Sequence, residues 1–178
     1  PRTRLDLAHT GISAIPENID LRKGFDLTGS PIADPASLRR LIAARRQTGS
    51  DLWLGRIESD LGIHHWMHHV PQARHAEKSA LWDAFVLEAN SAMMKQIRNL
   101  VRTPEFQVER LLLQRRVWSF IERFQNASYG EQRSLLRIAT DEASPGKMLD
   151  RLEEEIRKSD PTWQNQPPHH APGRPRLE

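Results

Sequence analysis

The chain has 178 residues, of which 38% are hydrophobic and 28% are charged, and its formal net charge is +3. This length and composition allow one ordinary globular domain, or a small domain with an appendage, and they exclude two large domains or a largely disordered chain. The sequence contains no cysteine, which excludes disulfides, thiolate nucleophiles and cysteine-based zinc sites.

The first 33 residues contain a short motif that occurs twice. Residues 5–12 read LDLAHTGI and residues 25–32 read FDLTGSPI, so equivalent apolar positions lie 20 residues apart. Both copies resemble the leucine-rich-repeat consensus L-x-L-x-x-N-x-L, with Thr10 and Ser30 at the asparagine position. We therefore predict that residues 1–33 are the end of a leucine-rich-repeat solenoid. The alternative is an unrelated β-hairpin packed on the helices.

In such a repeat, each L-x-L segment supplies a short parallel strand whose intervening residues face the concave surface. We predict that these exposed positions contact a protein partner; they are Asp6, Ala8, Asp26 and Thr28. Between the two copies, residues 15–19 (IPENI) resemble the L-P-x-x-L of the short bacterial repeat type, which serves protein recognition. Because one complete period cannot bury its hydrophobic face alone, we expect further repeats upstream of Pro1.

Residues 34–158 are predicted to form a helical domain that begins with one helix and a less regular segment. Asp34 and Pro35 are suited to the N-cap and first position of a helix that ends at Gly49. Residues 51–70 then predict one or two short helices broken at Gly62.

This less regular segment contains two of the tryptophans. We predict that Trp53 and Trp66 are exposed aromatic anchors for a partner, because their surroundings lack helical periodicity. Trp82 and Trp118 instead have the helical spacing that is typical of core positions.

The remaining sequence predicts four helices and a tail. Apolar residues in steps of four and three over residues 76–102 predict one long amphipathic helix. Thr103-Pro104-Glu105 begins a second helix that reaches about Gln125, while Ser128 or Tyr129 begins a third and Ser144-Pro145 a fourth. The expected fold is therefore mostly α, a helical domain of four or more amphipathic helices preceded by one to two repeats with short parallel strands. Residues 159–178 predict a disordered tail in which Trp163 docks locally.

Residues 64–69 (HHWMHH) contain two histidine pairs with i, i+4 spacing, which would place two imidazoles on one helical face. The H-E-x-x-H metalloprotease pattern is absent, and no third ligand can be identified. We therefore expect no tight metal site. Three readings remain open, namely structural or exposed histidines, a weak metal site at His64 and His68, and a pH-responsive cluster.

Two runs of charge are predicted to be solvated helix faces. One is the basic cluster of Arg39, Arg40, Arg45 and Arg46, for which phosphate binding is the alternative. The other is Glu153-Glu154-Glu155. Because a nucleic-acid surface normally neutralises several phosphates, the modest net charge makes nucleic acid an unexpected partner.

Three stretches in the helical part carry a resemblance to a known family. Residues 82–90 read WDAFVLEAN, residues 100–106 read LVRTPEF and residues 115–118 read RRVW. Together with a short-type leucine-rich repeat that runs directly into helices, they resemble bacterial effectors with a novel-type (NEL) E3 ubiquitin ligase domain. This resemblance implies type III secretion by a bacterium and action in the host cell cytoplasm. It also implies a host protein substrate bound by the repeats, with a ubiquitin-conjugating enzyme E2 and ubiquitin as further partners.

The sequence departs from this family at the catalytic loop. Ligases of the family carry ubiquitin on a cysteine in a C-x-D loop after these helices, whereas residues 143–148 here read ASPGKM. We therefore assign no catalytic residue and expect no cofactor. Two functions remain open. The chain would act like the cysteine-free XL-box ligase of plant-pathogen effectors, by positioning an E2~ubiquitin conjugate for attack, or it is a non-catalytic protein-interaction module that caps the repeats.

Overall fold

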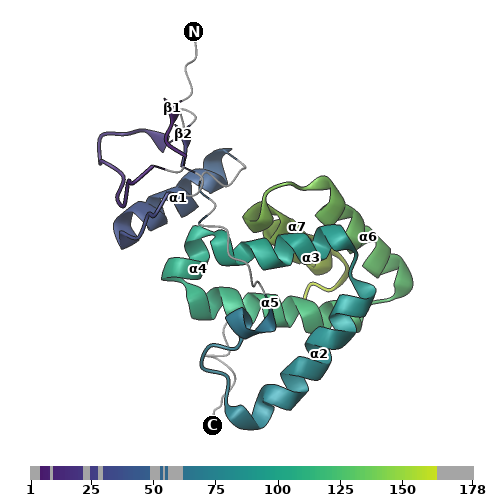
Figure 1. Ribbon diagram of the computed structural model, residues 1–178. Helices are drawn as coiled ribbons and strands as arrows, with labels where there is room; N and C mark the ends of the chain where they lie inside the picture. Colours follow the sequence, from purple (N-terminus) through teal and green to yellow (C-terminus); the bar gives the residue numbers. More distant parts are fainter. Residues whose placement is uncertain are drawn as a thin grey trace, which may run out of the picture.

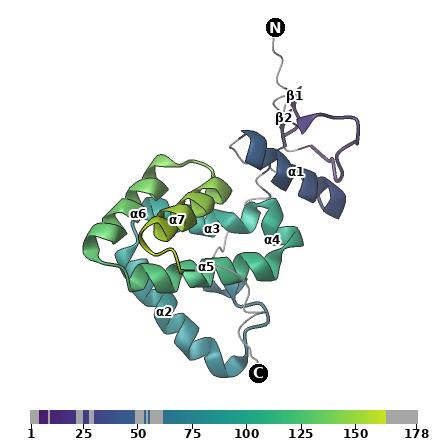
Figure 2. The ribbon, with the colours of Figure 1, turned by 180° about the vertical axis from the view of Figure 1, so that it is seen from behind.

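The computed structural model describes residues 5–8, 10–21, 25–27, 30–48, 53, 55 and 62–163. Within these residues the chain is mostly helical, as predicted, and two short strands lie near the N-terminus. The strands and the first helix form a small N-terminal unit beside a larger helical body, and the view from behind shows the same division (Figures 1 and 2). None of the described helices combines the length and apolar character needed to cross a membrane.

Two strands of two residues each, β1 (Leu5–Asp6) and β2 (Phe25–Asp26), pair in parallel. Leu5 lies opposite Phe25 and Asp6 lies opposite Asp26. The pairing follows the period of the sequence, because the paired residues occupy equivalent positions of the two motif copies. The prediction of short parallel strands thus agrees with the backbone pairing, and a hairpin, whose strands would be antiparallel, does not.

Hydroxyl groups connect the two motif copies next to the strands. Thr10 Oγ1 donates a hydrogen bond to the carbonyl oxygen of Leu7 at 2.8 Å, and Ser30 Oγ donates to the same oxygen at 2.6 Å. The two hydroxyl oxygens lie 3.2 Å apart. These are the residues at the asparagine position of the motif, so their polar side chains satisfy backbone groups inside the unit.

Helix α1 (Pro35–Thr48) belongs to the N-terminal unit and has the predicted bounds. Asp34 caps it, since its Oδ2 accepts the backbone N–H of Ser37 at 3.0 Å. Arg40 donates to the carbonyl oxygens of Pro16 at 3.0 Å and Ile19 at 2.5 Å. The apolar face of α1 completes a cluster that we call the N-terminal core, made of Ile15, Leu21, Leu27, Ile32, Leu38, Leu41, Ala44 and Trp53.

The helical body contains the other described helices, whose bounds are α2 (His75–Glu88), α3 (Ser91–Asn99), α4 (Pro104–Val108), α5 (Arg110–Gln125), α6 (Tyr129–Asp141) and α7 (Pro145–Ser159). Short 3-10 helices precede or join them, at η2 (Ile63–Trp66), η3 (Gln72–Arg74) and η4 (Leu100–Arg102). The predicted third and fourth helices are confirmed as α6 and α7. Ser128 and Ser144 cap them by accepting the backbone N–H groups of Glu131 and Lys147.

The single long helix predicted over residues 76–102 is wrong. The chain leaves the helical conformation at Ala89 and Asn90, whose ψ angles are 145° and 172°. Asn90 then starts α3, because its Oδ1 accepts the backbone N–H of Met93 at 2.8 Å. The helix predicted to continue to Gln125 is likewise broken at Glu109, with φ of −133° and ψ of 41°. The apolar stripes continue across both breaks, so periodicity did not reveal them.

One large core, which we call the main core, fills the helical body. Its fully buried residues include Trp66, Phe85, Phe120 and Phe124. Trp82 and Trp118 belong to it, which confirms their predicted core positions, with exposed fractions of 6% and 5%. Trp163 packs against the same core and lies near the Arg157 guanidinium, which confirms its local docking. The disordered tail predicted over residues 159–178 is thus wrong at its start, because Ser159 ends α7 and residues 160–163 are described; from residue 164 the tail lies outside the described residues.

Candidate functional site

The predicted recognition residues of the strands are only partly described. The backbones of Asp6 and Asp26 lie side by side in the strand pair. Ala8 is half-buried, and Thr28 lies outside the described residues. The strand pairing therefore brings two of the four predicted positions together.

The exposure predicted for Trp53 and Trp66 is wrong, so neither indole can anchor a partner. Trp53 is 3% exposed in the N-terminal core, and its Nε1 donates to the carbonyl oxygen of Ser30 at 2.7 Å. Trp66 has no exposed surface; its ring packs edge-on against Phe106, and its carbonyl oxygen accepts from Trp118 Nε1 at 2.7 Å. Both tryptophans fill core positions from irregular segments, where helical spacing gives no sign of burial.

The histidine run does not form the predicted helical face. η2 ends at Trp66, and the chain turns at His68 and His69, where His69 has a positive φ of 62°. The rings that contact each other therefore belong to sequence neighbours. The ring centres of His64 and His65 lie 4.1 Å apart, and those of His68 and His69 lie 4.0 Å apart. Among the described residues, no group of three or more histidine or carboxylate side chains is placed to hold a metal ion. The helical face on which the His64 and His68 pair was predicted is thus not formed.

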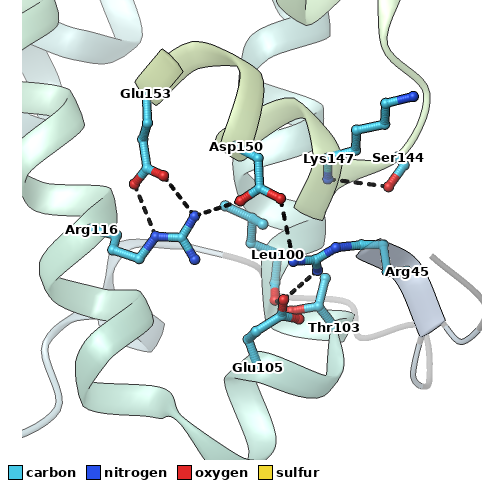
Figure 3. A network of polar contacts seen from close by, with 9 residues as sticks. All are labelled: Arg45, Leu100, Thr103, Glu105, Arg116, Ser144, Lys147, Asp150 and Glu153. Atoms are coloured by element: carbon cyan, nitrogen blue, oxygen red, sulfur yellow. Dashed lines mark hydrogen bonds and ion pairs between the residues drawn. The ribbon is translucent and has the colours of Figure 1, made fainter. Parts of the chain in front are cut away.

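Charged side chains join α1 to the helical body in what we call the junction network (Figure 3). The Arg45 guanidinium of α1 forms an ion pair with the Glu105 carboxylate of α4, and its other nitrogen lies 3.5 Å from Asp150 of α7. Asp150 also pairs with Arg116 of α5 at 2.8 Å, and Arg116 pairs with Glu153 of α7 at 2.8 Å. Four helices therefore meet in one chain of alternating charges.

The junction network corrects the prediction of solvated charge runs for one residue of each run, whereas Arg39 and Glu154 are exposed as predicted. Arg45 is 5% exposed and Glu153 is 5% exposed, so both are buried. Burial raises the pKa of the Glu153 carboxyl, although the Arg116 guanidinium acts in the opposite direction. Burial alone would lower the pKa of Arg116, but its hydrogen bonds and ion pairs with Glu153 and Asp150 raise it. Arg45 and Glu153 each lie on the apolar stripe of their helix, and this position in the sequence was a sign of their burial.

A second link joins the two parts of the molecule next to this network. The Gly55 backbone N–H donates to the carbonyl oxygen of Arg102 at 2.6 Å, and Arg102 Nε donates back to the carbonyl oxygen of Gly55 at 3.0 Å. A Cβ atom at Gly55 would lie 2.9 Å from the Trp53 ring, so the close approach requires glycine here. Trp53 packs in the N-terminal core, and Arg102 belongs to the helical body.

The residues that would correspond to a catalytic loop form an ordinary helix start. Ser144 caps α7, as its Oγ accepts the backbone N–H of Lys147 at 3.3 Å (Figure 3). Ser144 is 8% exposed. Its hydroxyl is thus committed to the helix cap, and the position contributes to folding.

A cleft of about 400 Å³ lies between the start of α2 and the middle of α5. The loop at residues 69–71 forms one end, and Gln114, Trp118 and Ser119 of α5 line the wall. Its charged residues are Arg74, Lys78, Arg115 and Glu122. We call this hollow the α2/α5 cleft. Its volume lies in the range of small-molecule and peptide side-chain pockets.

Lys78 is a charged residue of the α2/α5 cleft that is mostly buried. It is 9% exposed, and its Nζ lies 4.8 Å from the centre of the Trp118 ring, a cation–π contact. Burial lowers the pKa of Lys78, and the Glu122 carboxylate partly opposes this effect. This residue was not predicted from the sequence. Lys78 precedes Trp82 by four residues and Phe85 by seven, so a charged residue on the apolar stripe was the signal.

Comparisons with known proteins add no relative: no protein-family model, no curated protein and no solved structure matches the chain.

Proposed function

We propose that the chain is a protein-interaction module in which the helical body caps the end of a leucine-rich-repeat solenoid. The observation that carries this proposal is the N-terminal unit, where strands at equivalent motif positions pair in parallel in register. A repeat of this kind exposes one hydrophobic end, which a terminal cap must cover to keep the array soluble. Within this unit α1 packs against the core residues that follow the strands, and Arg45 and Gly55 connect the unit to the helical body.

Capping is tested by fusing the whole chain behind a consensus leucine-rich-repeat array that lacks its own C-terminal cap. We expect the fused array to be monomeric and to unfold cooperatively, because the exposed end of its last repeat is covered. Light scattering and denaturant unfolding measure both properties. If the fusion aggregates like the uncapped array, the capping proposal is wrong. A fusion to an unrelated helical domain of similar size is the control for solubility alone.

The second candidate function is an E3 ubiquitin ligase without a covalent step, which the resemblance to NEL effectors suggests. Such a ligase needs an exposed apolar surface on which an E2 docks. Leu87 at the end of α2 is 86% exposed, and Tyr129 at the start of α6 is 75% exposed. A hydrogen bond of 3.1 Å from Gln132 to Glu88 holds these two helix ends together. These two exposed side chains replace the two buried tryptophans as candidate E2 anchors.

Discharge of ubiquitin from purified E2~ubiquitin onto free lysine tests the ligase candidate. If the chain positions the thioester, discharge by at least one E2 of a broad panel is faster with the chain than without it. The L87A variant is then expected to lose most of this acceleration, while a K95M variant, at an exposed position of α3, retains it. An unchanged discharge rate across the panel would reject the ligase candidate.

A further inference from the structure

Two polar residues that are mostly buried, Lys78 and Gln114, line the α2/α5 cleft. Lys78 is 9% exposed, and no described residue forms an ion pair or a hydrogen bond with its Nζ; its close contact is the Trp118 ring. Gln114 is 6% exposed, and its Oε1 is buried without a hydrogen-bond partner among the described residues. A buried acceptor without a donor costs free energy, so Gln114 Oε1 calls for a partner such as a water, an ion or a ligand.

The orientation of the Gln114 side-chain amide is fixed by the hydrogen bond that its nitrogen donates. Its Nε2 donates to the carbonyl oxygen of His68 at 2.8 Å. A flipped amide would place Oε1 against that carbonyl oxygen and would leave the nitrogen without an acceptor. The atom of the Gln114 amide that lacks a hydrogen-bond partner is therefore Oε1. The cleft wall therefore holds an unsatisfied acceptor on α5, which a ligand reaches once the neighbouring side chains shift, and a cation on α2.

The charges around these two groups favour an anion. Arg74 and Arg115 also line the cleft, against the single carboxylate of Glu122. Arg74 pairs with Glu77 at 2.9 Å. Arg74 and Arg115 are both exposed, so their side chains are able to move toward a ligand. A ligand that combines a carboxylate with a neighbouring N–H donor satisfies Lys78 and Gln114 together.

We propose that the α2/α5 cleft binds an acidic peptide segment, with a ligand carboxylate paired to Lys78 and a ligand backbone N–H donating to Gln114 Oε1. A peptide fits better than a nucleic acid for two reasons. Phosphates offer no donor to Gln114, and Glu122 repels a continuous polyanion. The proposed site lies on the helical body and does not depend on the capping function. Burial lowers the pKa of Lys78, and a paired ligand carboxylate would raise it again.

Titration calorimetry with the whole chain tests the site. The probe is a short peptide, blocked at both ends, with two adjacent glutamates; the matched probe carries glutamines instead, and a short single-stranded oligonucleotide is the third. We expect saturable binding of the glutamate peptide only. In the K78M variant, whose side chain keeps much of the buried aliphatic stem, the affinity should fall by about tenfold or more, as for loss of a charge-assisted hydrogen bond.

Two further variants keep the result interpretable. K95M removes an exposed lysine of α3 away from the cleft and should bind like the wild type. R115Q changes an exposed residue of the cleft, so it should fold normally and lose affinity by about two- to fivefold. Equal binding of the glutamate and glutamine peptides, unchanged affinity in both K78M and R115Q, or preferential binding of the oligonucleotide would each overturn the proposal.

Discussion

Replacing Arg45 with methionine is expected to lower the free energy of unfolding by about 3–5 kcal/mol, the usual cost of breaking a buried ion pair. The side chains of Arg45 and Glu105 are each 5% exposed, so the variant leaves the Glu105 carboxylate in the interior without the guanidinium. The Asp150 side chain is 48% exposed and adds little to this cost. Chemical denaturation followed by circular dichroism measures the change.

A matched control and a second variant test whether the loss of stability in R45M comes from the ion pair between Arg45 and Glu105. R39M removes an exposed arginine of the same helix, and we expect its effect to stay within about 0.5 kcal/mol. Adding E105Q to R45M should recover part of the loss, because a neutral amide costs less to bury than a carboxylate. If R45M and R39M were equally mild, the junction network would not hold α1 to the helical body.

The features that the sequence predicted well are those that local chemistry determines. Asp34, Ser128 and Ser144 cap helices because a short polar side chain can reach the backbone N–H groups that the first turn leaves unbonded. The motif period set the strand register in the same way, since equivalent residues of neighbouring copies face each other. Each of these signals lies within a few residues or one period of the chain.

The features that the sequence did not predict depend on partners that are distant in the chain. Trp66 is buried in the same core as Trp118, 52 residues later, and hydrogen-bonds with it, while Arg45 meets Glu105 on another helix. A run of arginines looks the same whether its members meet water or a carboxylate. The position of a charged residue on an apolar stripe was the available sign, and it applies to Arg45, Glu153 and Lys78 alike.

The helix breaks at Asn90 and Glu109 were not predicted for a different reason. An apolar stripe continues through both positions because consecutive helices can bury their faces in one core, so periodicity alone joins them. Asn90 carried a competing signal, since its side chain favours the N-cap over the helix interior. Recognising that signal would have divided the predicted helix into α2 and α3.

The second large effect is expected from F85A, which should lower the free energy of unfolding by about 3–5 kcal/mol, as for other buried phenylalanines. Phe85 has no exposed surface, and its ring centre lies 5.5 Å from that of Phe124 and 6.1 Å from that of Phe120, both in edge-on contact. Removing the ring leaves a cavity between α2 and α5 as well as losing these contacts. The main core should therefore weaken where α2 packs against α5.

Leu87 provides the control, because it lies in the same helix two residues later and is 86% exposed. L87A replaces another large apolar residue by alanine in the same helix, so the local change in helix propensity is small and only burial differs strongly. We expect its free energy of unfolding to stay within about 0.5 kcal/mol of the wild type in the same denaturation experiment. A comparable loss in both variants would mean that the effect of F85A reflects the alanine itself and not the aromatic packing. A large loss in F85A alone would place α2 firmly on α5 and so support the wall of the cleft in which Lys78 meets Trp118.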